Sequence, residues 1–247
     1  KSSAAIATAL GVTSDTVKAT LQLMTIMDAN DTTGDTAAYD AYDNALNARG
    51  FSANEDTTFL QQVAPQTEMI AGSTVAAQGV SGSVQGIMSN RMASLRSGDG
   101  YIGTGMSAGG AMSAKSGFIQ AFGSTAEQKS KTVGSGTQAG FDSDSTGVAI
   151  GFDGISDSGT TLGLSLSMSN TDLDGKGAGK VKNDMDTYTA SIYMDKATDV
   201  GYVEGSLTFG ISENASTRNI TSAGLNRTLT GAYDASQLSL NIGVGMP

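Results

Sequence analysis

Apolar and small or polar residues alternate along a series of short segments in the second half of the chain. Residues 161–169 carry the clearest example, because every even position is apolar and every odd position is small or hydroxylic. Strict alternation gives a β-strand one apolar face and one polar face. Since the polar face carries glycine and serine where a soluble protein would carry lysine and glutamate, the pattern favours a transmembrane β-barrel over a soluble sandwich.

Six candidate strands follow one another to the end of the chain, and five of them alternate cleanly. We predict them at residues 117–126, 146–155, 160–170, 186–195, 201–212 and 234–245. The faces of the first strand cannot be assigned, because its pattern is mixed. The apolar positions that we expect to face lipid include Val148, Ile150, Leu162, Leu164, Leu166, Leu207, Phe209, Leu238 and Leu240.

The predicted connections alternate between long and short. This is typical of outer-membrane barrels, which have short periplasmic turns and long external loops. Six strands cannot close, since the smallest bacterial barrels have about eight and an open edge in lipid leaves backbone groups unpaired at several kcal/mol each. We therefore expect an incomplete all-β transmembrane barrel, with further strands encoded beyond Pro247. Because Lys1 is not an initiator methionine and no apolar signal core follows it, we also expect the chain to start inside a larger protein.

A helical period precedes the strands. Apolar residues recur at steps of three and four between Val80 and Leu95, which predicts an amphipathic helix over 83–96, about 21 Å long at about 1.5 Å per residue. Glycines at 79, 82 and 86 weaken its first turns. We divide the chain into an α-helical or irregular passenger remnant at 1–64, a linker helix with a glycine-rich segment at 65–116, and barrel strands at 117–247.

Composition removes several classes of chemistry. The chain has no His and no Cys, so neither a Ser-His-Asp triad nor a usual zinc site can be built. The net charge is −10 with only 14 basic residues, which argues against nucleic acid as a partner. We predict no cofactor and no metal.

Several segments, in order, carry a family resemblance. They are the passenger-end run at 59–65, Ser89-Asn90-Arg91-Met92-Ala93-Ser94-Leu95-Arg96 on the helix, and strand-like runs at 117–123, 140–153 and 162–170. With them the chain resembles the C-terminal part of a classical type V autotransporter. The resemblance implies a barrel of about twelve strands in the bacterial outer membrane, of which about six are present here. It also implies a helix that threads the pore and a passenger delivered to the cell surface. The implied partners are outer-membrane lipid, the protein's own passenger and the barrel-assembly machinery.

Some members of this family cut their own linker helix at an Asn-Asn pair. The matching positions here are Gly86 and Ile87, so the asparagine that would cyclise is missing and we predict no self-cleavage and no enzyme. Glu204 could assist a hydrolysis in the lumen, but a structural carboxylate is the favoured interpretation.

The predicted helix suggests a set of ion pairs. Arg91 and Arg96 would lie toward its periplasmic end, where Asp153 and Glu204 face inward beside short turns. We predict that one or both arginines pair with these acids, because an unpaired charge in the lumen is costly. The alternative is that both arginines are solvated at the pore mouth.

Two functions are compatible with this pattern. The first is an outer-membrane translocator and anchor that carries an upstream passenger to the cell surface. The second is the tail of a surface adhesin or binding protein whose activity lies in that passenger. A soluble all-β domain that acts on sugars through carboxylates is disfavoured, because no paired acids stand out and aromatic residues are few.

Overall fold

The computed structural model describes residues 61–62, 66–97, 112–133, 136–221 and 226–246. The predicted passenger remnant lies almost entirely outside the described residues, as does the glycine-rich segment from 98 to 111. The elements are α5 (Thr67–Ser97), β1 (Met112–Gln128), β2 (Lys131–Val133), β3 (Gly136–Gln138), β4 (Phe141–Ser156), β5 (Thr160–Gly175), β6 (Lys182–Thr198), β7 (Gly201–Ile220) and β8 (Arg227–Gly245).

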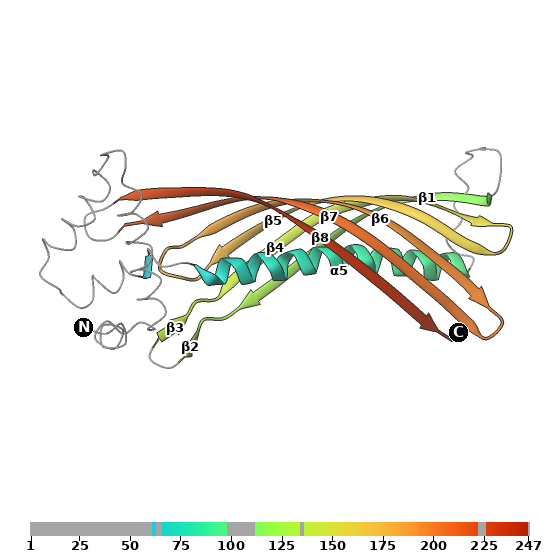
Figure 1. Ribbon diagram of the computed structural model, residues 1–247, viewed down its shortest axis with the longest axis horizontal. Coiled ribbons are helices and arrows are strands. Elements are labelled where there is room, and N and C mark those ends of the chain that lie inside the picture. Colours follow the sequence, from blue (N-terminus) through green and yellow to red (C-terminus); the bar gives the residue numbers. More distant parts are fainter. Residues whose placement is uncertain (1–60, 63–65, 98–111, 134–135, 222–225, 247) are drawn as a thin grey trace, which may run out of the picture.

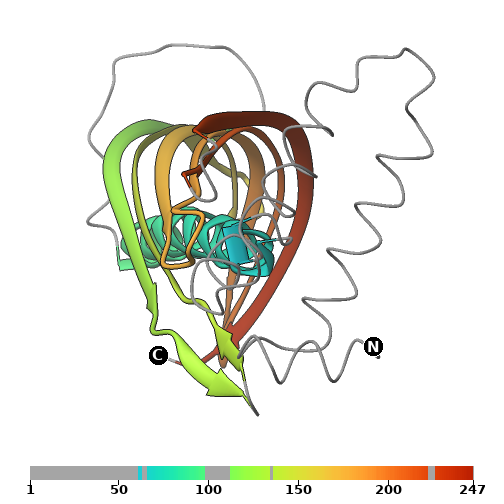
Figure 2. The same ribbon diagram turned by 90° about the vertical axis from the view of Figure 1, so that its left-hand side faces the viewer.

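Six long strands form one sheet in the order β1-β4-β5-β6-β7-β8, and every neighbouring pair is antiparallel. The hairpin β2-β3 interrupts the connection between β1 and β4. The sheet curves around α5, which lies along its concave face (Figures 1 and 2). The predicted all-β architecture of about six strands with a preceding helix is thus confirmed, and the sheet is not closed among the described residues.

The strands are longer than predicted. β5 continues to Gly175 and β7 to Ile220, and β8 begins at Arg227, seven residues before the predicted start. On β5 the exposed residues up to Met168 are apolar, whereas the next exposed residues are Asn170 and Asp172. The strand therefore continues while its outer face changes from apolar to polar, and that change looks like a loop in the sequence.

Helix α5 is also much longer than the predicted 83–96. It spans Thr67–Ser97, about 46 Å at about 1.5 Å per residue. Gly72 packs so closely that a Cβ there would lie 2.8 Å from Leu173 Cδ1, and a Cβ on Gly79 would overlap Ser124. These glycines let the helix approach the sheet, and this packing overrides their low helix propensity. Among the described residues, no helix is both long enough and apolar enough to cross a membrane.

Two apolar clusters lie between α5 and the sheet. The first, which we call the upper core, consists of Met69, Phe141, Leu173 and Val181 near the start of the helix. The second, the lower core, consists of Val84, Met88, Met92 and Tyr193, with Phe118 and Phe122 of β1 packed against it. The unassigned first strand thus directs its two phenylalanines inward, while Ile119 is 75% exposed on the outer face.

Candidate functional site: an enclosed helix and its charged anchors

Helix α5 presents one apolar stripe to a wall of hydroxyl groups. Val80, Val84, Met88 and Met92 are almost completely buried. The strands face them largely with serine and threonine, whose hydroxyls bond to one another across strand pairs, as in Ser167 with Thr189 at 2.6 Å, Thr187 with Ser212 at 2.8 Å and Ser191 with Thr208 at 2.8 Å. Because these six hydroxyls are satisfied within the wall, an apolar helix can lie against them, whereas Ser169 Oγ on the same face of β5 is buried without a hydrogen-bond partner among the described residues.

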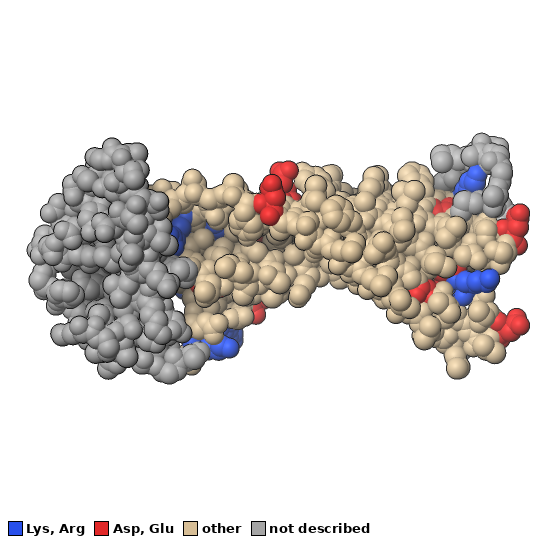
Figure 3. Space-filling view, in the orientation of Figure 1, with Lys and Arg blue, Asp and Glu red and all other residues tan. Residues whose placement is uncertain are grey.

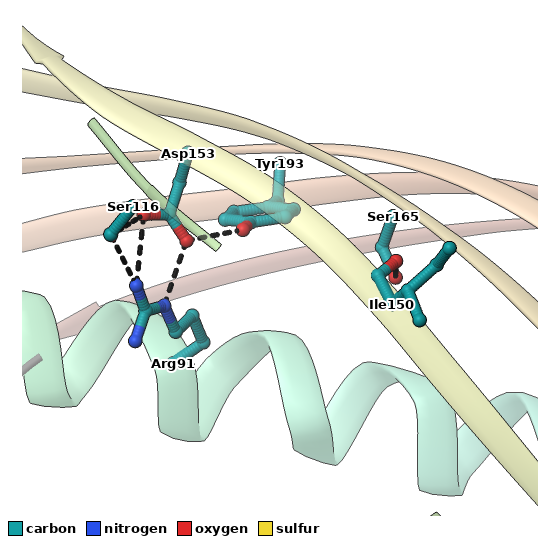
Figure 4. Close-up of polar contacts among 6 residues, drawn as sticks. All are labelled: Arg91, Ser116, Ile150, Asp153, Ser165 and Tyr193. Atoms are coloured by element: carbon teal, nitrogen blue, oxygen red, sulfur yellow. Dashed lines mark hydrogen bonds and ion pairs between the residues drawn. The ribbon is translucent and has the colours of Figure 1, made fainter. Parts of the chain in front are cut away.

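Arg91 forms the first charged anchor, with Asp153 of β4 (Figure 4). Its Nε donates to Asp153 Oδ2 at 2.7 Å and its Nη2 donates to Oδ1 at 3.0 Å. The same carboxylate accepts from Ser116 Oγ at 2.6 Å and from the Tyr193 hydroxyl at 2.9 Å, and Arg91 also bonds to Ser116. The Asp153 side chain is fully buried and that of Arg91 is 13% exposed. This is a desolvated two-pronged pair, the geometry in which arginine binds a carboxylate most strongly.

Arg96 forms the second anchor, five residues further along the helix. Its Nη1 donates to Glu204 Oε2 at 2.9 Å and also pairs with Asp195. Asp195 and Glu204 stand directly opposite each other on β6 and β7, so they would repel without a cation between them. The Arg96 guanidinium also lies 3.7 Å from the centre of the Tyr202 ring.

The four predicted anchor residues therefore form two separate sites, Arg91 with Asp153 and Arg96 with Glu204. The sequence analysis missed four further members, which are Ser116, Tyr193, Asp195 and Tyr202. Tyr193 and Asp195 occupy odd positions on β6, in phase with the inward Thr187, Thr189 and Ser191, so extending that alternation would have found both. Ser116 was missed because it was assigned to the flexible segment before the first strand.

The outer face of the sheet carries the predicted lipid-facing residues. Eight of the nine are exposed, while Val148 is half-buried. Figure 3 shows an uncharged surface between an acidic patch near the middle of this view and the charged groups at the right-hand end. An exposed apolar surface of this extent marks an interaction with a membrane or another apolar partner. Within the described residues, no group of three or more carboxylates is arranged to hold a metal ion.

Comparison with known proteins identifies the strands. No curated protein and no solved structure matches the chain. The family model of the autotransporter β-domain, however, matches residues 117–247, which is more than half of the chain and begins within β1. Domains of this family act as translocators and anchors in the bacterial outer membrane. The antiparallel sheet, the helix along its concave face and this match together show that the chain belongs to the autotransporter β-domain family.

Proposed function

We propose that this domain delivers the segment upstream of α5 to the cell surface and then keeps α5 in the lumen as a plug. The observation that carries the proposal is the helix on the concave face of the sheet, whose two arginines are held by carboxylates of β4, β6 and β7. A helix with satisfied charges in a polar lumen is a stable resting state, because breaking a buried pair typically costs about 3–5 kcal/mol. Export through the lumen therefore ends with α5 seated against the sheet and both of its arginines paired.

The outer apolar residues support a position in the bilayer. On β7 the exposed residues from Val203 to Ile211 are all apolar, over about 27 Å along the strand at about 3.4 Å per residue. This is comparable with the roughly 25 Å apolar band of outer-membrane barrels. Beyond it, Glu213 begins the charged part of the strand. We infer that the nine predicted residues face lipid and that the charged rows lie in the headgroup region or in water.

The two ends of the sheet give the domain a direction. The turns from Ser156 to Thr160 and from Thr198 to Gly201 are short, and the Arg96 anchor lies at their end of the sheet. We assign this end to the periplasm, since short turns face that side in outer-membrane barrels. The start of α5 then lies at the external end. A chain that precedes the helix would therefore emerge at the cell surface.

This orientation leads to a division of the chain. We propose 1–64 as the end of a passenger, 65–116 as the linker and 117–247 as barrel strands that the barrel-assembly machinery inserts. The alternative, that the chain is the tail of a surface adhesin or other binding protein whose activity lies in the upstream passenger, stays a prediction.

The test is surface delivery from the full-length protein in a Gram-negative host. An epitope placed before residue 61 should be accessible to antibody and to protease on intact cells. Leu164→Arg should lower the level of assembled protein, because an arginine on the lipid face costs about 2–4 kcal/mol at the bilayer midplane. Asp172→Arg is the matched control, since it introduces the same side chain on the same face of β5 beyond the apolar residues. Equal assembly of the two variants, or an epitope that stays protected in the unmodified protein, would refute the proposal.

A further inference from the structure

The turn between β5 and β6 does not project away from the sheet but folds over the start of α5. Figure 2 looks onto this end of the molecule, and the orange turn lies in front of the beginning of the helix. Backbone bonds hold the turn in this position. Gly175 N donates to Val181 O at 2.8 Å, and Lys180 N donates to Gly177 O at 3.0 Å, which closes the turn on itself.

Two further backbone bonds attach the turn to its neighbours. Lys176 N donates to Gly140 O at 2.9 Å, just before β4, and Asn219 N near the end of β7 donates to Gly179 O at 3.4 Å. Lys176 also pairs with Asp142 at 2.7 Å and with Glu127 at 3.0 Å, both on the rim of the sheet. The turn is therefore fixed to strands on both sides of the β5-β6 hairpin.

The glycines of this turn mark its contact with the helix. A Cβ on Gly177 would overlap Glu68 Oε1 and would lie 2.8 Å from Gln66 Oε1. A Cβ on Gly179 would lie 3.2 Å from Cδ of Arg218, which also interacts electrostatically with Glu68. A larger residue at position 177 therefore has to displace the ends of the Glu68 and Gln66 side chains, which pack against this turn at the start of the helix.

The upper core lies directly beneath the turn. Val181, the residue after the turn, is 6% exposed and packs in the cluster with Met69 of the helix and with Phe141 and Leu173 of the sheet. Since Met69 belongs to α5, this cluster is complete only when the helix occupies the lumen. The position of the turn and the presence of the helix are thus coupled through one apolar cluster.

We propose that residues 176–180 are a cap that closes over the start of α5 once the helix is seated, and that the upper core holds the cap shut. The cap occupies the mouth of the lumen, so a chain in transit has to displace it. It closes when transit ends, because only the seated helix supplies Met69 to the upper core. The inference rests on the proposed function, since it assigns the cap to the external end of the domain.

Cysteine labelling on intact cells tests the cap, because the chain contains no native cysteine. In the full-length protein, Met69→Cys should react slowly with a membrane-impermeant maleimide, whereas Asp174→Cys, on an exposed outward side chain, should react fast. Adding Gly177→Leu should raise the Met69→Cys rate about tenfold or more, because labelling follows the population of locally opened states. Gly205→Leu is the matched control, since a Cβ there meets only Asn241 O at 3.5 Å.

Two results would overturn the cap. One is fast labelling of Met69→Cys in the otherwise unchanged protein, and the other is an unchanged slow rate in an assembled Gly177→Leu variant. If Gly177→Leu fails to assemble, the double variant Glu68→Cys/Gly177→Cys tests the contact instead. A short bismaleimide should cross-link the two cysteines. Absence of the cross-link would contradict the contact between the turn and the helix.

Timing is tested on the same cross-linked molecules. All of them should carry an epitope that external protease can remove, since the cap closes after export. Cross-linked molecules with a protected epitope would contradict the timing. This result differs from a failure of the proposed function itself. If the domain did not deliver the upstream segment to the cell surface, the epitope would be protected from protease in the unmodified protein as well.

Discussion

Removing the Asp153 carboxylate should destabilise the domain more than removing both members of its pair with Arg91. In Asp153→Leu, the Arg91 guanidinium keeps its buried position but loses both of its bonds to the carboxylate, and the Tyr193 hydroxyl loses its acceptor. A buried charge left without its partner costs about 3–5 kcal/mol. Arg91→Met should cost a similar amount, because Asp153 then keeps only the neutral donors Ser116 and Tyr193.

The double variant Arg91→Met/Asp153→Leu distinguishes this explanation from a simple loss of contacts. Replacing a buried ion pair by apolar side chains of similar volume is often neutral, so the double variant should be more stable than either single variant. The corresponding interaction free energy is several kcal/mol. Unfolding in urea can be followed in detergent micelles by far-ultraviolet circular dichroism, which suits a chain without tryptophan.

The Lys176–Glu127 pair provides a control outside the lumen. Its side chains are 30% and 57% exposed, so Glu127→Gln should change the free energy of unfolding by about 1 kcal/mol or less. If the two lumen substitutions add to within about 0.5 kcal/mol, Arg91 and Asp153 are not coupled and the anchor is refuted.

Three further substitutions have definite expected outcomes. Arg96→Lys should lower the free energy of unfolding by roughly 1–2 kcal/mol, because lysine cannot both bridge two carboxylates and stack on Tyr202; an unchanged urea midpoint would contradict this. Gly82→Ala should stabilise the domain by about 1 kcal/mol, since a Cβ there meets nothing within 4 Å. Gly72→Ala should be less stable than Gly82→Ala by about 1–3 kcal/mol, because its Cβ would press on Leu173 and Phe141, and equal midpoints would refute that packing.

Alternation in the sequence was sufficient to predict six strands and the face of five of them. It was insufficient for the first strand, because Phe118 and Phe122 face the helix there and Ile119 faces outward. Periodicity within one strand carries no information on what lies against it. Most inward positions of the other strands carry small or hydroxylic residues. On β1, Phe118 and Phe122 occupy inward positions because they pack against the apolar residues of α5.

The charged anchors were predictable in part, for a related reason. The positions of Arg91, Asp153 and Glu204 follow from the phase of one helix and two strands. Which carboxylate meets which arginine depends on the rotation of α5 against the sheet, and no local pattern encodes this rotation. Ser116 completes the first anchor because β1 begins before the segment with recognisable alternation.

The strand ends were missed because the sheet changes its apolar face along its length. On β5, Leu162, Leu164 and Leu166 are exposed, whereas Leu173, at an odd position, is buried in the upper core and Asp172 beside it points outward. In the part of β5 that we assign to the bilayer, the apolar side chains lie on the outer face of the sheet. In the part beyond it, toward the start of α5, the apolar side chain lies on the inner face. The upper part follows the rule of a soluble protein, with its own apolar core around the start of α5. Lipid cannot stabilise that part, so its stability depends on Met69 of the helix. The passenger leaves the lumen at this same end. Seating of the helix therefore matters most for the stability of the external end of the domain.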